Sequence, residues 1–418
     1  MCFRIVAAEN RKVAMGPSEI LENCLCDVSV TKPALLVVGP TYSVSFNRRK
    51  LRALAEYFDI TCATSQLSDR SFYGLPIQDF EEVNTQEPFL VRRLVEFPKG
   101  KKFTKFFYGG LERVFREKQF DFILVDSEPW GLVKWQSWLL AKLYQRKALF
   151  GAFSWENVKR NGLKGRILSA VYRLSALADD FTIAGNQACR ALLLAHGVDP
   201  ARNLVAAQLG VDVELFHPVD EREKCACRER LGLPATGFLI GFCGRLVPEK
   251  GLIELRDALQ RVCAVRSDVR LVLLGHGPLA REPGLSQEPW ITILSSRPHY
   301  EIPKFMQSLD LFILPSKPIC ESDHVWEEQF GHVLIEAMAC GVPAIGSDSG
   351  AIPEVVGERL AIFRHGSVDS IYDKLIALLQ APEDLAVIAT RQKERVMQFY
   401  SHEAVARIYA DFLGSIRK

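Results

Sequence analysis

Short apolar or β-branched runs alternate along this chain with longer amphipathic stretches, a pattern typical of strand-helix units on a parallel sheet. Predicted strands cover residues 34–39, 58–63, 121–126, 147–153, 180–185 and 203–207 in the first half, and 237–244, 269–275, 290–294, 309–315, 343–346 and 359–363 in the second. Six runs in each half predict an α/β fold made of two similar, doubly wound, Rossmann-like domains.

The boundary between these domains is predicted from a change in composition. Residues 212–236 are charged and lack a predicted strand, so we expect a first domain over 1–211 and a second over 212–400. Ser401 is a suitable helix N-cap and precedes an apolar face at helical spacing, formed by Val405, Ile408, Tyr409, Phe412 and Leu413. A final helix over 401–418 follows, which can pack back on the first domain.

Length and composition indicate a globular protein. The 418 residues are 48% hydrophobic, and the 28 glycines and 21 prolines are too few for a collagen-like or low-complexity chain. No apolar run approaches the roughly 18 to 20 residues of a membrane span, and the start is charged too early for a signal peptide, so we expect a cytoplasmic protein. Residues 1–30 match no periodic template, and their role stays open.

The cysteines favour a reducing compartment. There are eleven, an odd number without disulfide-framework spacing, and several stand in apolar or glycine-rich runs. The two Cys-x-Cys pairs, at 24 and 26 and at 225 and 227, have no matching Cys or His pair nearby, so no zinc site is expected.

Charge is unevenly distributed along the chain. The net charge is only +2, yet residues 101–178 hold 15 Lys and Arg against 6 Asp and Glu, and Phe103, Phe106, Phe107 and Tyr108 lie among them. This stretch is a candidate surface for an anionic membrane or a phosphorylated acceptor. A solvated helix face explains the same charges equally well.

The most informative segment is residues 328–343, GluGlnPheGlyHisValLeuIleGluAlaMetAlaCysGlyValPro. It predicts a tight turn followed by a helix that ends at Gly341, and the unpaired N–H groups at a helix start can hold an anion or sugar hydroxyls. Glu328 precedes the turn and Glu336 lies in the first helical turns, where a pair of carboxylates suits the vicinal hydroxyls of a sugar or ribose. As an alternative, Glu336 is a capping carboxylate that stabilises the helix dipole.

Two earlier strand ends carry further candidates. Gly244, Arg245 and Lys250 follow the strand at 237–244, where fixed cations can neutralise a departing diphosphate. The next strand ends in GlyHisGlyPro, whose glycines Gly275 and Gly277 allow close backbone approach. Taken singly, a solvated ion pair and an ordinary turn explain these segments as well.

Together these segments resemble glycosyltransferase family 4, whose members are retaining enzymes that use nucleotide sugars. The resemblance spans nearly all of residues 180–400 and rests on the motifs at 210–218, 244–251, 275–278, 310–316, 328–343 and 347–354. It implies the GT-B architecture, in which two Rossmann-like domains face a cleft.

The resemblance also implies roles for single residues. Glu328 would bind hydroxyls of the transferred sugar, Glu336 the nucleotide ribose, and Arg245 with Lys250 the leaving diphosphate. The backbone of Phe330, Gly331 and His332 would contact the sugar or diphosphate, and Arg297 falls where the family lodges the base.

The first domain gives thinner evidence for a site. Its candidates for the acceptor side stand at predicted strand ends or in the loops that follow: Gly39, Asp126, Glu128, Glu156 and Asn157. Loop capping explains any one of them as well. Many family members carry a histidine here, whereas all eight histidines of this chain lie at 196 or beyond, so another residue must orient the acceptor.

We therefore expect a cytoplasmic glycosyltransferase of the hexosyltransferase type, acting in polysaccharide, glycolipid or other glycoconjugate synthesis. It would take a nucleotide-diphosphate sugar as donor and a glycan or lipid-linked acceptor, with no cofactor, no metal and no nucleic acid, and could associate peripherally with the inner face of an anionic membrane. The chain contains no Asp-x-Asp triplet, which agrees with metal independence. Alternatives are a nucleotide-sugar epimerase or a phosphorylase of the same fold, and a sugar-nucleotide-binding protein without turnover.

Overall fold

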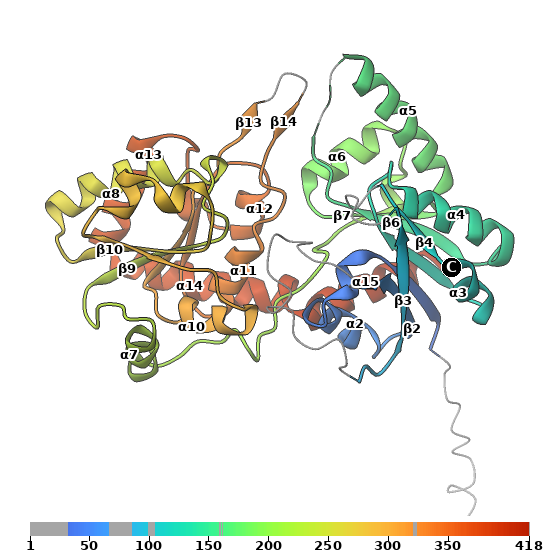
Figure 1. Ribbon diagram of the computed structural model, residues 1–418, viewed down its shortest axis with the longest axis horizontal. Helices are drawn as coiled ribbons and strands as arrows, with labels where there is room; N and C mark the ends of the chain where they lie inside the picture. The colour runs from blue at the N-terminus through green and yellow to red at the C-terminus, as the bar shows by residue number, and fades with distance from the viewer. Residues whose placement is uncertain are drawn as a thin grey trace, which may run out of the picture. The chain divides into compact units, whose positions relative to one another are not determined.

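The protein is described by a computed structural model, which covers residues 32–66, 86–98, 105–158, 160, 162–320 and 324–417. These residues form two α/β domains of the Rossmann-like type, each built around its own sheet (Figure 1). The predicted fold class is confirmed, and all twelve predicted strands are present. Residues 1–30, including the Cys24 and Cys26 pair, lie outside the described residues.

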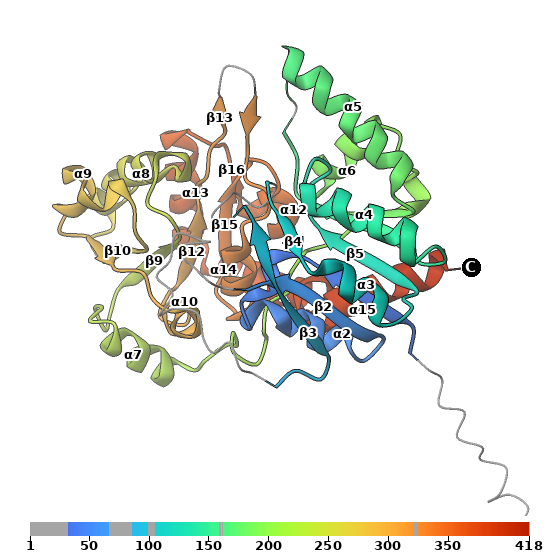
Figure 2. The ribbon, with the colours of Figure 1, turned by 45° about the vertical axis from the view of Figure 1, so that its right-hand side comes forward.

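The first sheet has eight strands in the order β4-β3-β2-β1-β5-β6-β7-β8, parallel except between β3 and β4. Its strands are β1 (Ala34–Val38), β2 (Asp59–Ser65), β3 (Leu90–Phe97), β4 (Phe107–Gly109), β5 (Phe122–Asp126), β6 (Leu149–Ser154), β7 (Phe181–Ala184) and β8 (Asn203–Val205). Its helices are α2 (Arg49–Leu54), α3 (Leu111–Glu117), α4 (Leu132–Tyr144), α5 (Gly162–Ala178) and α6 (Gln187–Ala195), of which α3 and α4 lie side by side (Figure 2). The central strands read as continuous apolar runs because helices cover both faces of a parallel sheet.

The second sheet has six parallel strands in the order β11-β10-β9-β12-β15-β16. They are β9 (Phe238–Cys243), β10 (Val269–Leu274), β11 (Ile291–Leu294), β12 (Leu311–Leu314), β15 (Ala344–Ser347) and β16 (Ile362–Phe363), and a separate hairpin pairs β13 (Ile319–Cys320) with β14 (Val325–Trp326). The helices are α7 (Glu221–Arg230), α8 (Leu252–Val265), α9 (Pro283–Ser286), α10 (Ile302–Met306), α11 (His332–Ala339), α12 (Ile352–Val356), α13 (Val368–Gln380), α14 (Pro382–Arg395) and α15 (His402–Ile416).

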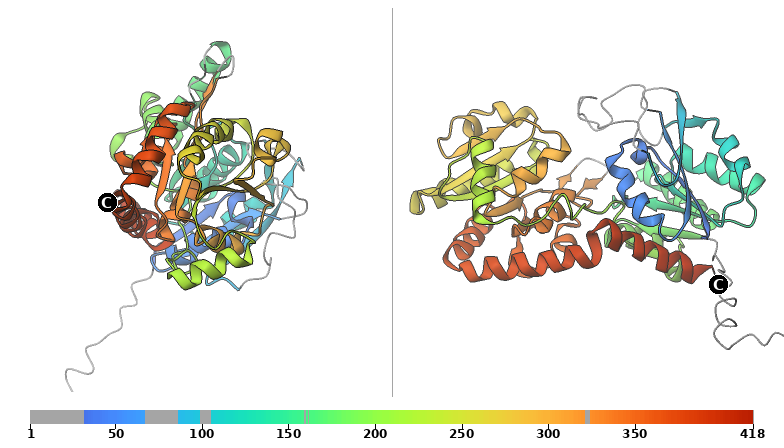
Figure 3. Two further views of the ribbon diagram at one scale, coloured as in Figure 1. Left: turned by 90° about the vertical axis from the view of Figure 1, so that its left-hand side faces the viewer. Right: turned by 90° about the horizontal axis from the view of Figure 1, so that it is seen from below.

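The chain passes from the first sheet to the second and returns at neighbouring points. The N–H of Val211 donates to the carbonyl of Tyr400 at 2.7 Å, and the N–H of His402 donates back to Val211. Ser401 caps α15 by accepting from the N–H of Ala404. From there α15 runs past the end of α14 and packs against α2, where the Tyr409 hydroxyl donates to the carbonyl of Ala207 (Figure 3). The C-terminal helix thus returns to the first domain.

Two expectations about the first domain need correction. The strand β3 was not predicted, because its run LeuValArgArgLeuValGluPhe places two arginines among apolar residues instead of alternating cleanly. The expected basic, aromatic face is wrong for Phe106 and Tyr108, which lie in the core, where Tyr108 shares a hydrogen bond of 2.8 Å with Ser65. Only Phe107 between them is exposed, because successive residues of a strand point to opposite faces. Phe103 lies outside the described residues.

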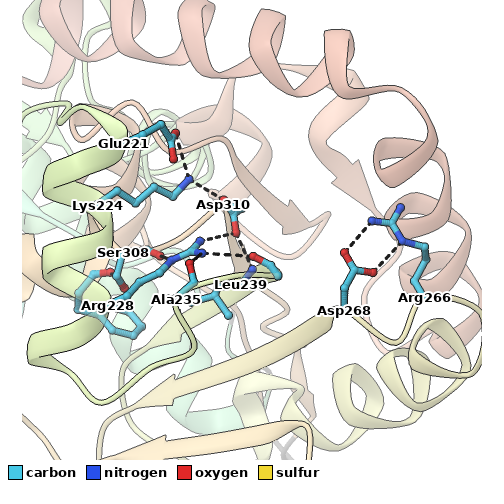
Figure 4. Close-up of polar contacts among 11 residues, drawn as sticks. Glu221, Lys224, Arg228, Ala235, Leu239, Arg266, Asp268, Ser308 and Asp310 are labelled. Atoms are coloured by element: carbon cyan, nitrogen blue, oxygen red, sulfur yellow. Dashed lines mark hydrogen bonds and ion pairs between the residues drawn. The ribbon is translucent and has the colours of Figure 1, made fainter.

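A buried charge cluster at the start of β12 holds α7 against the second sheet (Figure 4). Asp310 accepts from Arg228 Nη2 at 2.7 Å, from Lys224 Nζ at 2.6 Å and from the N–H of Leu239 at 2.6 Å. The Arg228 side chain is only 6% exposed and also donates to the carbonyl of Ser308. The cluster explains how the charged segment 212–236 packs a helix, α7, against the sheet.

We predict that Asp310→Ala lowers the free energy of unfolding by about 2 to 4 kcal/mol, because it leaves the buried Arg228 guanidinium unpaired. Urea or thermal unfolding measures the change. Asp268→Ala is the matched control, since its pair with Arg266 is more than 40% exposed on both sides (Figure 4) and should contribute less than about 1 kcal/mol. Equal effects of the two substitutions would contradict the role of Asp310.

Candidate functional site

A cavity of about 250 Å³ lies at the carboxyl ends of β9, β10 and β11 in the second domain. Four predicted site residues line it, namely Gly244, Arg245, Arg297 and Glu336. The remaining lining residues are Cys243, Leu274, Gly275, His276, Ser296, His299, Ile302 and Val333. Open parallel sheets bind ligands at this end of the strands, so the cavity is the candidate ligand site of this domain.

Two glycines after β10 let the loops that follow β9 and β10 touch through their backbones. A Cβ atom on Gly275 would stand 1.8 Å from the carbonyl oxygen of Gly244, and one on Gly277 would stand 2.3 Å from that of Leu246. Both glycines also have positive φ angles, 155° and 150°. Gly277 therefore shapes the neighbouring loop rather than the lining, which does not include it.

Lys250 and Glu328 are brought together as direct partners. Lys250 Nζ donates to Glu328 Oε2 at 2.5 Å, and the Ser316 hydroxyl donates to the same oxygen at 2.8 Å. Their side chains are only 13% and 11% exposed, whereas Arg245 is 58% exposed and lies 3.3 Å from Glu249. Lys250 and Glu328 form this shielded pair outside the lining of the cavity, whereas Arg245 lines the cavity and is open to solvent.

The predicted turn before α11 is present and is held by the first domain. Gly331 adopts φ 76°, which glycine tolerates, and α11 begins at His332. Asn186 Nδ2 donates to the carbonyl of Gln329 at 2.8 Å, and the Phe330 ring lies 5.5 Å from the ring of Trp155. Backbone at the start of α11 therefore meets side chains that follow β6 and β7.

Glu336 is buried in the wall of the cavity with an unforeseen partner. Burial by itself would raise the pKa of this carboxyl, but the charge and hydrogen bond of His299, with His332 nearby, lower the pKa below its usual value. The distance from His299 Nε2 to Glu336 Oε1 is 2.8 Å. The sequence predicts Arg297 at this strand end but not His299. The only signal for His299 is its place after the same strand.

His332 itself is shielded from water. Burial lowers the pKa of its imidazole, and both ring nitrogens lack a hydrogen-bond partner among the described residues. Next to the turn, the ring therefore keeps one N–H donor and one acceptor nitrogen without a partner in the described part of the chain.

Three acceptor-side candidates gather where β5 and β6 end. Glu128 accepts from the N–H of Trp155 at 3.0 Å and from the Ser154 hydroxyl, and burial raises its pKa to about 7. Glu156 accepts from the N–H of Val158, and burial raises its pKa as well. The side-chain oxygen and nitrogen of Asn157 are buried without a partner among the described residues. Glu128 and Glu156 thus hold their own loops, whereas Asn157 keeps hydrogen-bonding groups that no described residue uses.

The other two candidates, Asp126 and Gly39, lie deeper. Asp126 accepts from Gln208 Nε2 at 3.1 Å, and burial raises its pKa against the opposing charge of Lys50. A Cβ on Gly39 would stand 2.8 Å from the Cβ of Asp126, so Gly39 permits this packing. Within the described ranges, no three His, Cys, Asp or Glu side chains gather as a metal site.

Part of the chain is similar to known glycosyltransferases. Residues 224–395 match the family model described as glycosyl transferases group 1. The chain is 30% identical over 210 residues to a GDP-mannose-dependent monoacylated alpha-(1-6)-phosphatidylinositol monomannoside mannosyltransferase of Corynebacterium glutamicum, covering 49% of this chain and 55% of that one. It is also 30% identical over 228 residues to a D-inositol 3-phosphate glycosyltransferase of Mycobacterium leprae, covering 50% and 49%. The chain thus spans about half the length of these relatives.

Solved structures share the fold along most of the chain. A glycosyltransferase from Rickettsia africae superposes with a TM-score of 0.69 at 16% identity, covering 93% of this chain and 99% of that one. The Anabaena protein Alr3699/HepE in complex with UDP superposes with a TM-score of 0.66 at 18% identity, covering 92% and 100%. The fold is therefore that of GT-B glycosyltransferases.

We predict that Glu128→Gln removes part of the pH dependence of stability. Because the folded pKa is about 7 and the ordinary value 4.5, the folded protein retains a proton that the unfolded chain releases, so stability falls as the pH rises from about 4.5 to 7. The glutamine copies the protonated acid and should be more stable than the parent at pH 8 by about 1 to 3 kcal/mol.

Unfolding in urea at several pH values measures this difference. Asp179, whose pKa burial raises to about 6, contributes a fall of the same sign that the substitution leaves in place. Glu112→Gln, on a half-exposed side chain, is the control. Parallel curves for Glu128→Gln and the parent would show that Glu128 titrates normally.

Proposed function

We propose that this chain is a retaining glycosyltransferase of family 4 that moves a hexose from a nucleotide-diphosphate sugar to an acceptor hydroxyl, without a metal. The observation that carries the proposal is the cavity between Gly244, Arg245 and Glu336, together with the Lys250–Glu328 pair, which joins the segment after β9 to the segment before α11. A carboxylate for ribose hydroxyls and cations for a diphosphate are the groups that such a donor requires. The relatives named above, which use GDP-mannose or inositol phosphates, support this donor and acceptor chemistry.

In the proposed reaction the acceptor oxygen bonds to the anomeric carbon as the bond from that carbon to the diphosphate breaks. The diphosphate leaves on the face from which the acceptor enters, and its oxygen takes the acceptor proton, so configuration is retained without a side-chain nucleophile. Lys250 and Arg245 stabilise the growing negative charge, and Glu328 binds hydroxyls of the transferred sugar.

A donor screen tests the proposal. The purified chain is incubated with UDP-, GDP- and ADP-sugars, with and without glycan or lipid acceptors, and nucleotide release and products are followed. Transfer that requires an acceptor supports the proposal. Free nucleotide from the donor alone would favour an epimerase, a requirement for inorganic phosphate a phosphorylase, and binding without turnover a sugar-nucleotide-binding protein.

We predict that Lys250→Ala lowers kcat more than it raises the KM of the donor, because charge on the leaving diphosphate grows toward the transition state. The expected loss in kcat is about 100- to 1000-fold, as for removal of one oxyanion donor. Steady-state kinetics on the donor found in the screen measure it.

Lys374→Ala is the control, since this lysine only donates to the carbonyl of Leu360 in the second domain. Near-normal turnover of Lys250→Ala, or parent activity that EDTA abolishes and manganese restores, would contradict the metal-free role of Lys250.

We further propose that the first domain associates peripherally with an anionic membrane at the inner face, where the acceptor is lipid-linked. Four apolar side chains recur along α5 with 55% to 87% exposure, namely Leu163, Ile167, Leu174 and Leu177. Beside them lies a groove of about 870 Å³ whose lining includes Arg160, Arg166 and Arg173. No described helix is long and apolar enough to cross a membrane.

The combination of charge and apolar surface favours an anionic lipid surface over a soluble partner. Arg166 and Arg173 make no ion pair with any described residue, so their charges stay available at the groove. Basic side chains near an anionic membrane contribute on the order of 1 kcal/mol each, and exposed apolar side chains add a part that salt does not screen.

We predict that the chain co-sediments with anionic vesicles more than with neutral ones, and that salt reduces the binding. Arg166→Ala with Arg173→Ala should weaken it roughly ten- to thirtyfold. Leu163→Gln with Leu177→Gln should abolish the salt-resistant part, whereas Leu360→Gln in the second domain, half-exposed, should not. Equal recovery with neutral and anionic vesicles would favour a soluble acceptor.

A further inference from the structure

His299 connects the carboxylate of Glu336 with the first domain. It opens the short turn η7 (His299–Glu301) after β11 and lines the cavity beside Glu336. An ionised carboxylate only accepts hydrogen bonds, so Nε2 of the imidazole donates to Oε1 of Glu336, 2.8 Å away. The other oxygen, Oε2, has no hydrogen bond to a described residue and remains available to a ligand.

The orientation of this imidazole is set by aromatic packing. Its ring centroid lies 3.8 Å from that of Phe46, with an interplanar angle of 45°, and 5.4 Å from that of Phe216. Nδ1 is buried without a partner in the described part of the chain, so no second hydrogen bond fixes the ring. The two phenyl rings are therefore the contacts that hold His299 against Glu336.

Phe46 belongs to the first domain. It starts the turn η2 (Phe46–Arg48), which follows β1, and it is not among the residues that line the cavity. The next residues along the chain anchor this turn, because Arg49 pairs with Asp212 where the chain crosses between the domains. A side chain of the first domain thus contacts the residue that holds a carboxylate of the second.

We propose that Phe46 is a positioning residue for donor binding, acting through His299 on Glu336. The inference rests on the proposed function, in which Glu336 binds the ribose of the donor. When Phe46 is in place, the imidazole is held and the carboxylate is organised before the nucleotide arrives. Because coupling between two equilibria is reciprocal, a bound nucleotide stabilises the contact between Phe46 and His299 to the same extent.

Calorimetric titration with UDP, GDP and ADP tests the inference without turnover. For the diphosphate that binds the parent chain, Phe46→Ala should weaken binding about three- to tenfold, as expected for one aromatic contact. His299→Leu should weaken it about ten- to hundredfold, because it removes a hydrogen bond to a charged group, whereas His299→Gln keeps an N–H donor and should recover most of the affinity.

The double variant of Phe46→Ala with His299→Leu should bind about as weakly as His299→Leu alone, because Phe46 acts only through the imidazole. In steady-state kinetics Phe46→Ala should raise the KM of the donor and leave kcat nearly unchanged, since the lost interaction is the same in ground and transition states. A purely structural role would lower the melting temperature without these two signatures.

Two controls keep the outcomes distinct. Phe107→Ala truncates an exposed aromatic on β4 and should leave affinity unchanged, and Phe46→Leu replaces Phe46→Ala if that variant does not fold. Parent affinity in the folded Phe46 variant, or additive losses in the double variant, would overturn the inference alone. A parent chain that binds none of the three diphosphates, or binds one equally well after Glu336→Gln, would overturn the proposed function and the inference with it.

Discussion

The ion pair between Lys250 and Glu328 is the interaction on which the strand ends of the second domain depend. Lys250 follows β9, Glu328 precedes α11, and Ser316, which follows β12, donates to the same carboxylate oxygen. The carbonyl of Glu328 also accepts from the N–H of Ala351, which follows β15. Two charges that are nearly nine-tenths buried are tolerated only as partners. A shift of any of these loops would therefore leave a buried charge without its partner. Lys250 can turn toward an incoming anion only if Glu328 gains other donors, and sugar hydroxyls are such donors.

Contacts of the segment that follows Glu328 also reach the first domain. The turn that follows Glu328 is held by Asn186 and by the ring of Trp155, while the two crossings of the chain pair at Val211 and Ser401. After the second crossing, α15 packs on α2. The ammonium of the buried Lys50 on α2 lies 3.8 Å from the ring centroid of Tyr409 on α15. The first domain therefore contacts the second at several places, and the contacts of Asn186 and Trp155 lie at the turn whose residues are proposed to bind the donor.

Local pattern predicted most of the fold, because parallel strands buried on both faces are continuous apolar runs and caps such as Ser401 act on their own helix. Prediction from local pattern failed where pairing between strands decides the structure. In β3 the arginines at 92 and 93 interrupt the run, yet pairing with β2 makes it a strand. The burial of Phe106 and Tyr108 also depends on contacts with β2 and α4 that no local window contains. Of the candidate site, the motif residues were recognisable, but the partners were not, since Lys250 and Glu328 stand 78 positions apart and His299 and Glu336 stand 37 apart.

The strand ends of the two sheets carry different charged side chains. The strand ends of the second domain present Arg245 and Lys250, whereas those of the first present Glu128 and Glu156, both buried and both with raised pKa values. Ionised carboxylates accept hydrogen bonds from hydroxyls and repel phosphate, so the strand ends that carry Glu128 and Glu156 favour a hydroxyl group over an anion. Since burial raises the pKa of Glu128 to about 7, that repulsion is weakest when the acid is protonated and grows as the pH rises.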